Sequence, residues 1–143
     1  MTPPSEYFRR DQADGITPPN LSDESTFAEH IVHARGKRTR FTSLSLDPTL
    51  IVEFGPQLWR LLHPKLAGDG HGVVDHDTLV RGLRDEARSA SDPVTQDLAA
   101  RALPRAIRRR ESIVSWSFDV SRVARKDLSE WARPRVRPYF VKA

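Results

Sequence analysis

The sequence predicts an α+β fold in a single domain. Segments that favour strands and segments that favour helices follow one another without the regular alternation of a doubly wound sheet. The chain has 143 residues, the length of one ordinary domain. We expect residues 1–5 to form a loose leader and residues 6–143 to form the domain.

Residues 6–10 are expected to form the first strand. The next segment, 11–21, contains a glycine, two adjacent prolines and an asparagine, which predicts a loop. Ser22 or Asp23 can accept hydrogen bonds from the first amides of a helix, and Gly36 is a suitable residue to end it.

Residues 40–46 alternate and carry β-favouring side chains, so they predict a strand. An Asp-Pro pair follows, which is typical of the first turn of a helix and predicts a short helix at 49–54. Residues 57–62 are apolar enough for an interior strand, and 64–72 are expected to be a loop.

The C-terminal half is expected to contain three helices and two strands. Leu79, Val80, Leu83 and Ala87 share one face of the first helix, and Pro104 is expected to kink or split the second. The expected helices are 77–90, 92–109 and 121–131, and the expected strands are 112–120 and 136–141.

Composition excludes several classes of site. The chain has no cysteine, so it contains no disulfide, thiolate metal site or cysteine nucleophile. No apolar run approaches the roughly 20 residues that span a bilayer, and no basic-then-apolar signal is visible at the N-terminus. We therefore expect no membrane association, in a cytoplasmic protein or in an effector that is secreted or delivered by another route.

The charge is asymmetric. Residues 101–143 carry 12 Lys or Arg and 4 Asp or Glu, whereas residues 1–100 carry 11 and 15, which gives +8 against −4. A basic third of this kind suits an anionic partner such as nucleic acid or a cofactor phosphate. The alternative is an Arg-rich solvated surface without a specific partner.

Three features together could form a site for a pyridine dinucleotide. Arg9 or Arg10, early in the chain, could hold a phosphate by charge and fork geometry. Thr42 and Ser43 lie on a strand whose hydroxyls could brace a sugar or a carboxylate. Glu111 immediately precedes the strand predicted at 112–120, and a carboxylate there could bind a ribose hydroxyl and stabilise positive charge at the anomeric carbon.

The order of short motifs along residues 7–50 resembles the N-terminal half of the cholera-toxin-like ADP-ribosyltransferases. The motifs are Tyr7-Phe8-Arg9, the loop Gly15-Ile16-Thr17-Pro18, the string His33-Ala34-Arg35-Gly36 at the end of a helix, and Thr42-Ser43-Leu44-Ser45. The resemblance implies two small, roughly antiparallel sheets that form an NAD cleft, with helices outside.

The resemblance also implies roles for individual residues. Arg9 matches the motif arginine that shapes the NAD pocket, with Arg10 as the alternative after a register slip of one residue. Thr42 and Ser43 match the last two residues of the family's Ser-Thr-Ser triplet, and the first serine falls on Phe41. Ser43 or Thr42 would then take over the bracing of the site, and His33 would line the pocket.

Glu111 is at the place of the catalytic glutamate of the family. Members that modify arginine carry a second Glu or Gln two residues earlier, where this chain has Arg109. The resemblance therefore implies an NAD-cleaving transferase or glycohydrolase, in a toxin or effector whose acceptor is not arginine. Arg108, Arg109 and Arg110 would suit an anionic acceptor such as nucleic acid; a protein acceptor and an immunity protein or antitoxin are further expected partners.

Each residue also has a plainer interpretation. Arg9 could be a surface ion-pair partner, the hydroxyls could form the wet face of a strand, and Glu111 could neutralise its basic neighbours. A non-catalytic interaction module or a basic nucleic-acid-binding module therefore remains the alternative. His71, Asp75, His76 and Asp77 have side chains that bind metals, but they lie in or near a Gly-rich loop without a helical His-Glu-x-x-His pattern, so we expect no metal site.

Overall fold

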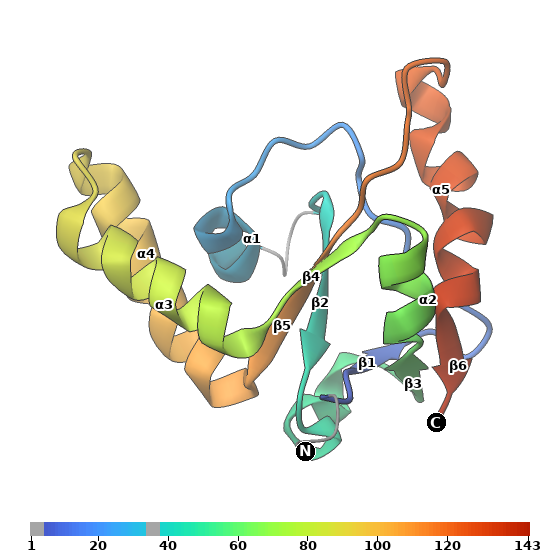
Figure 1. Ribbon diagram of the computed structural model, residues 1–143, viewed down its shortest axis with the longest axis horizontal. Coiled ribbons are helices and arrows are strands. Elements are labelled where there is room, and N and C mark those ends of the chain that lie inside the picture. The colour runs from blue at the N-terminus through green and yellow to red at the C-terminus, as the bar shows by residue number, and fades with distance from the viewer. Residues whose placement is uncertain (1–4, 34–37) are drawn as a thin grey trace.

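The computed structural model describes residues 5–33 and 38–143, and confirms the α+β class. Its six strands form one antiparallel sheet in the order β4-β5-β2-β1-β3-β6 (Figure 1). The expectation of two sheets is wrong, because one pairing between β1 and β2 joins the two halves. Most of the expected leader and the expected helix stop at Gly36 lie outside the described residues.

The strands are β1 (Phe8–Asp11), β2 (Phe41–Ser45), β3 (Gln57–Leu61), β4 (Gly72–Val74), β5 (Glu111–Ser115) and β6 (Phe140–Lys142). The α-helices are α1 (Phe27–His33), α2 (His63–Gly68), α3 (His76–Ser89), α4 (Pro93–Arg109) and α5 (Leu128–Val136). The 3-10 helices are η1 (Pro48–Phe54), η2 (Arg125–Asp127) and η3 (Arg137–Tyr139).

The middle of the sheet is a narrow seam. β2 pairs with β5 over five residues and β1 with β3 over four, whereas β1 and β2 share one register pair, Phe8 with Ser45. The three strands on each side therefore pair extensively with one another and little across the seam. A side chain from β1 and a side chain from β2 can meet beside it.

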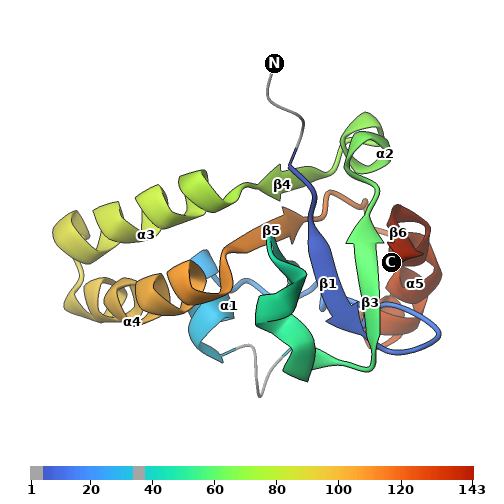
Figure 2. The same ribbon diagram turned by 90° about the horizontal axis from the view of Figure 1, so that it is seen from below.

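Helices cover both faces of the sheet. Successive residues of a strand point to opposite faces, and Phe41 of β2 and Ile113 of β5 pack with α1, α3 and α4. Their neighbours Leu44 and Val114 pack into the other core, with residues of β3, α2, α5 and β6. Figure 2 shows α3 and α4 side by side as a hairpin that extends from the sheet.

The first helix begins later than its sequence suggested. Asp23 does not cap it, because its carboxylate accepts hydrogen bonds from the amides of Ser25 and Arg40. Thr26 and Glu29 instead form a capping box: the Thr26 hydroxyl accepts from the Glu29 amide at 3.2 Å, and the Glu29 carboxylate accepts from the Thr26 amide at 3.1 Å. The helix therefore starts at Phe27.

Two elements that overlap the expected loop at 64–72, α2 and β4, were not predicted. Pro64 stands in the first turn of α2, where a missing amide hydrogen costs nothing, and β4 begins at Gly72. β5 is shorter than expected and ends at Ser115. The amide of Ser117 donates to Nδ1 of His71 at 2.9 Å and not to a neighbouring strand.

The last helices also differ in extent from the prediction. α4 continues through Pro104 as one helix, so the proline does not split it. α5 lies seven residues later than its expected start, because Leu128, Ala132 and Val136, four residues apart, are the positions that pack into the core. Among the described helices, none has the length and apolar character needed to cross a membrane.

Gly55 allows η1 to turn close behind β1, which predicts a specific sensitivity. A Cβ atom at this position would lie 2.7 Å from the carbonyl oxygen and 2.8 Å from the amide nitrogen of Asp11, closer than real contacts allow. Gly55→Ala should therefore lower the free energy of unfolding by about 1–3 kcal/mol, measured by urea denaturation. Gly82→Ala in α3 is the control: it has open space and should be neutral or stabilising by up to about 1 kcal/mol.

Candidate functional site

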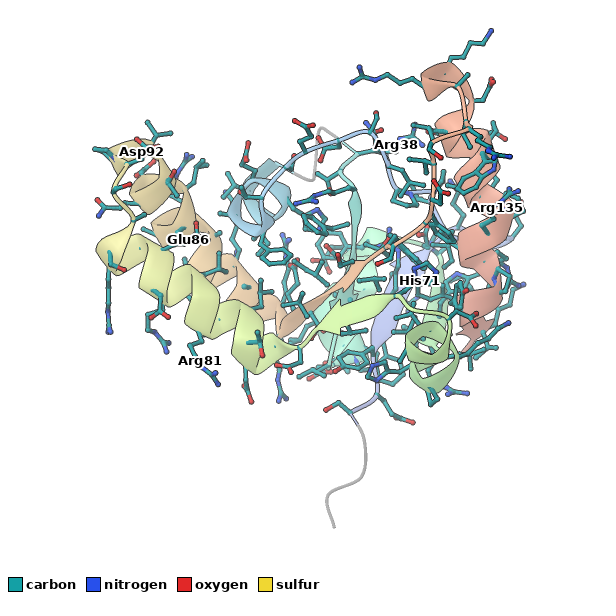
Figure 3. All side chains as sticks on the ribbon, turned by 45° about the horizontal axis from the view of Figure 1, so that its top comes forward. Arg38, His71, Arg81, Glu86, Asp92 and Arg135 are labelled. Carbon is teal, nitrogen blue, oxygen red and sulfur yellow. The ribbon has the colours of Figure 1, made fainter. Side chains whose placement is uncertain are left out.

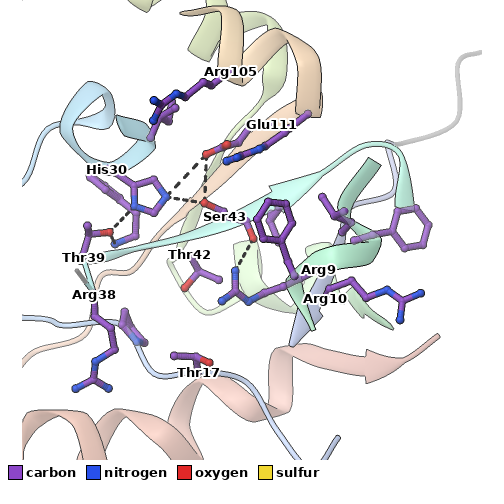
Figure 4. Close-up of a pocket in the computed structure, with 18 of the residues that line it drawn as sticks. Arg9, Arg10, Thr17, His30, Arg38, Thr39, Thr42, Ser43, Arg105 and Glu111 are labelled. Carbon is purple, nitrogen blue, oxygen red and sulfur yellow. Dashed lines mark hydrogen bonds and ion pairs between the residues drawn. The ribbon is translucent and has the colours of Figure 1, made fainter. Parts of the chain in front are cut away.

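A pocket of about 580 Å³ opens beside the β1–β2 seam. β1, β2 and β5 contribute to its lining, together with α1, the end of α4 and η1 (Figure 4). The pocket is strongly basic, because its charged lining residues are Arg9, Arg10, Arg38, Arg105, Arg108, Arg109 and one acid, Glu111.

Ser43 and Glu111 meet in this pocket. Register pairs Ser45 with Glu111 and Ser43 with Ile113, so the two side chains share one face of the sheet. The Ser43 hydroxyl donates to Oε2 of Glu111 at 3.2 Å. This serine lies two residues after the position where the resemblance placed the first motif serine, and a shift of two residues keeps the same face.

His30 completes the cluster, and sequence reasoning did not assign it a role. Its Nε2 lies 2.7 Å from the Ser43 hydroxyl and 3.9 Å from Oε2 of Glu111, and its Nδ1 is hydrogen bonded to the Thr39 hydroxyl. When Ser43 donates to Glu111, Nε2–H of His30 must donate to Ser43, and Thr39 must then donate to Nδ1. The four groups form a continuous hydrogen-bonded chain.

Arg9 reaches the same place from the other side of the seam. Its Nη1 donates to the carbonyl oxygen of Ser43 at 3.0 Å, and its Nε donates to Asp11 at 2.8 Å. Burial alone would raise the pKa of Asp11, but Arg9 and hydrogen bonds from Thr17 and Gln12 hold that pKa below its usual range. The ionised Asp11 therefore fixes Arg9, whose Nη2 donates no hydrogen bond to any residue that the structure describes.

The other predicted binding residues lie differently. Arg10 also lines the pocket, but its guanidinium points away from Ser43 and donates to the carbonyl oxygen of Pro56 at 3.4 Å (Figure 4). Thr42 lines the pocket, but its hydroxyl accepts from Nε1 of Trp116 at 2.8 Å and so braces an aromatic ring. His33 is the last residue of α1, and its side chain lies outside the described part of the structure.

Phe41 supports the site by packing. Its ring is buried and meets the His30 ring edge-on, with centroids 5.7 Å apart. It also contacts Phe27 at the start of α1. The aromatic residue at the position of the first motif serine therefore helps to hold His30 against Ser43.

The burial of the cluster suppresses charge. The side chains of His30 and Glu111 are 5% and 4% exposed. Burial raises the pKa of Glu111 to about 7, although Arg109, the Ser43 hydroxyl and Arg9 each lower it. Burial, with a smaller contribution from Arg9, lowers the pKa of His30 to about 4, although the charge of Asp23 raises it. The close contact of these two groups is therefore not an ion pair at neutral pH, because His30 is neutral.

The backbone of Glu111 is held as firmly as its side chain. His76, at the start of α3, donates from Nδ1 to the Glu111 carbonyl oxygen at 2.7 Å. Arg110 takes the left-handed conformation at the C-cap of α4, which turns the chain directly into β5. The Ser45 hydroxyl donates to the carbonyl oxygen of Arg109 at 2.7 Å. The glutamate is thus placed by a helix end and not by a long loop.

The basic C-terminal third divides into two surfaces. Arg105, Arg108 and Arg109 of α4 line the pocket. The arginines of α5, such as Arg135, lie at the other end of the molecule from the α3–α4 hairpin (Figures 1 and 3). A partner that uses both surfaces would have to extend across the whole protein.

The histidines and acids near 71–77 have separate structural roles. Nδ1 of His71 accepts the Ser117 amide within a cluster of Trp116, Phe118 and Tyr139, whereas Asp75 caps α3. Within residues 5–33 and 38–143, no group of three or more His, Asp or Glu side chains is placed to hold a metal ion.

The two pKa shifts predict opposite pH dependences of stability. Glu111 binds its proton more tightly in the folded state, so its contribution falls as pH rises from about 4.5 to about 7. His30 binds its proton less tightly, so its contribution is lost as pH falls from about 6.5 to about 4. Relative to wild type, Glu111→Gln should gain stability as pH rises from about 4.5 to about 7, by on the order of 2–3 kcal/mol.

His30→Gln should show the reverse, gaining stability relative to wild type as pH falls from about 6.5 to about 4. Urea denaturation at half-unit pH intervals measures both differences. Glu130→Gln, which removes an exposed carboxylate from α5, should give a flat difference. Flat differences for the two pocket variants would contradict the charge assignment.

Comparison of the chain with protein-family models, with curated proteins and with solved structures found no match. The function must therefore be argued from the pocket itself, and the resemblance to cholera-toxin-like ADP-ribosyltransferases stays a prediction from short motifs.

Proposed function

We propose that the pocket binds NAD and cleaves the bond between nicotinamide and ribose, as mono-ADP-ribosyltransferases and NAD glycohydrolases do. The observation that carries the proposal is the meeting of Arg9, Ser43 and Glu111 from three different strands in one basic pocket. These are the residues in which the motif order resembles that family. A cation for phosphate and a braced carboxylate for ribose are what this chemistry requires.

Glu111 would act on the ribose. Its carboxylate can accept a hydrogen bond from a ribose hydroxyl and stabilise the positive charge that develops at the anomeric carbon, as carboxylates do in glycosyl transfer. Ser43 holds one carboxylate oxygen at 3.2 Å, which leaves the other oxygen for the substrate. Because a preorganised carboxylate need not reorient as charge develops, the hydrogen-bonded chain from Thr39 favours catalysis.

Arg9 would hold the dinucleotide. The pyrophosphate of NAD is anionic, and the guanidinium can bind it with the nitrogen that Asp11 and Ser43 leave available. Arg9 also lies near the Ser43–Glu111 contact, since it donates to the Ser43 backbone. The phosphate and the scissile bond would therefore be positioned by neighbouring residues of one site.

The reaction would proceed without a metal or a redox step. The bond between C1′ and the pyridine nitrogen breaks, and neutral nicotinamide leaves with the bonding electron pair. Water or an acceptor then forms a bond to C1′ and loses a proton. The Glu111 carboxylate, whose pKa is about 7, is a suitable base for that proton at neutral pH.

The cost of burying Glu111 also supports a catalytic role over pure binding. Strongly shifted groups in pockets are more common at catalytic sites. The position of Arg109 along the pocket supports an acceptor other than arginine, because like charges repel.

Nicotinamide release from NAD by the purified protein tests the proposal. Wild type should release nicotinamide, and Glu111→Gln and Arg9→Ala should each lower kcat/KM by about 100-fold or more, because Gln cannot stabilise the positive charge at the anomeric carbon and Ala cannot hold the pyrophosphate. Chromatography of the products measures the rate.

Arg133→Ala is the matched control for the loss of a cation, since Arg133 is exposed on α5 away from the pocket, and its rate should equal that of wild type. Absence of both nicotinamide release and NAD binding in calorimetry would overturn the proposal.

The rate should also depend on pH with a defined sign. The ionised form of Glu111 is required, so kcat/KM should fall about tenfold per unit below pH 7 and level off above it. A profile that is flat between pH 5.5 and 8.5 would show that Glu111 does not titrate in the catalytic step.

A further inference from the structure

We propose that the acceptor of the ADP-ribosyl group is a base of single-stranded nucleic acid, which binds at the pocket mouth between the end of α4 and η1. This inference rests on the proposed function and names its substrate class. The mouth is formed by Arg105, Arg108 and Arg109 of α4 and by Phe54 of η1, all of which line the pocket.

The pocket holds more positive charge than a dinucleotide needs. Its lining contains six arginines and one acid, whereas NAD carries one negative charge on each of two phosphates and a positive pyridinium. Arg9 is already placed for the dinucleotide. Arg108 makes no hydrogen bond or ion pair with any residue that the structure describes, and Arg109 contacts the ring of Phe54. The surplus suits a second, repeating anion such as a phosphodiester backbone.

Phe54 adds a flat surface to this charge. Phe54 is 38% exposed, and it is one of the few large apolar residues described as exposed. The Arg109 guanidinium lies 4.8 Å from the centre of the ring. An exposed aromatic ring beside arginines is what single-stranded nucleic-acid sites use, because every base can stack on it. An acidic peptide would use the arginines, but its carboxylate side chains have no flat surface to stack on the ring.

The depth of the site selects a single strand. The Glu111 side chain is 4% exposed, so a reacting base must enter the pocket to reach the ribose that Glu111 would hold. A base within a duplex is stacked and paired, and its extraction costs a few kcal/mol. An unpaired base can enter while its flanking phosphates stay at the arginines of the mouth.

The transfer balances without another reactant. A nitrogen lone pair of the base forms the new bond to C1′ as nicotinamide leaves with its electron pair. The attacking nitrogen then loses one proton to the Glu111 carboxylate, which returns it to water. The products are nicotinamide and a base that carries one ADP-ribosyl group.

Two measurements on the full chain test the inference. Binding is measured by fluorescence anisotropy at several salt concentrations. The probes are a labelled mixed-sequence single-stranded DNA, its RNA counterpart and a duplex. Mass spectrometry of the same oligonucleotides after incubation with NAD measures transfer. Both single strands should bind at least tenfold more tightly than the duplex, with affinity falling as salt rises, and should gain one ADP-ribosyl group.

The variants locate the binding surface. Arg108→Gln and Phe54→Ala should each weaken single-strand binding by about 5-fold or more, and Arg108→Gln should also reduce the salt dependence by about one phosphate contact. Arg133→Gln on α5 is the matched control and should bind as wild type does. Nicotinamide release into water should be the same in Arg133→Gln as in wild type, since Arg133 is exposed on α5 away from the pocket.

The possible failures are distinguishable. Nicotinamide release without oligonucleotide binding or modification would overturn this inference and leave the proposed function standing. Tighter binding to duplex, or equal losses in Arg133→Gln and Arg108→Gln, would also overturn it. Oligonucleotide binding without any NAD cleavage would overturn the proposed function and, with it, the assignment of the bound base as an acceptor.

Discussion

The site depends on one constraint, the burial of the Glu111 carboxyl group in contact with a buried imidazole. Burial disfavours the charged forms of both His30 and Glu111, so it shifts the two pKa values in opposite directions and past one another. In the unfolded chain at pH 5.5 the proton belongs to the histidine, and in the folded protein it belongs to the glutamate. Folding therefore replaces two opposite charges with two neutral groups joined through Ser43. The helices α1 and α4 and the β2–β5 pairing create this environment, because together they exclude water from the face that carries the cluster.

Elements whose apolar side chains recur with a clear period were predictable from the sequence. Elements whose position depends on tertiary contacts were not. The strands around Phe41 and Ile113 alternate, and α3 presents leucines at helical spacing, so all three were predictable. β4 is three residues long and is held by pairing with β5 alone, which no local pattern reveals. Likewise, Asp23 is as good a cap as Thr26 in isolation. The carboxylate of Asp23 instead accepts a hydrogen bond from the amide of Arg40, which is distant along the chain.

The order Arg9, Ser43, Glu111 could be predicted as a candidate site, but the meeting of these side chains could not. Their contact depends on the β2–β5 register and on the seam beside β1. The motif string contains His33 and not His30, so the resemblance gave His30 no role. The spacing along α1 does indicate that His30 is buried, because it lies three residues after Phe27 and on the same face as Phe27 and Ile31. A polar side chain on such a face needs a partner, and Ser43 on the predicted hydroxyl strand was an available one.

The seam has a mechanical consequence. The two halves of the sheet share one register pair, and the Arg9 contact with the Ser43 backbone crosses the gap between them. A ligand that binds Arg9 and Glu111 together would connect the two sides of this gap and couple the motions of β1 to those of β2 and β5. Few main-chain bonds join the halves at the seam, although Leu44 and Val114 pack in one core with residues of β3 and β6. Occupancy of the pocket would therefore reduce local opening at the seam, and amide hydrogens along the seam would report this by slower exchange with solvent.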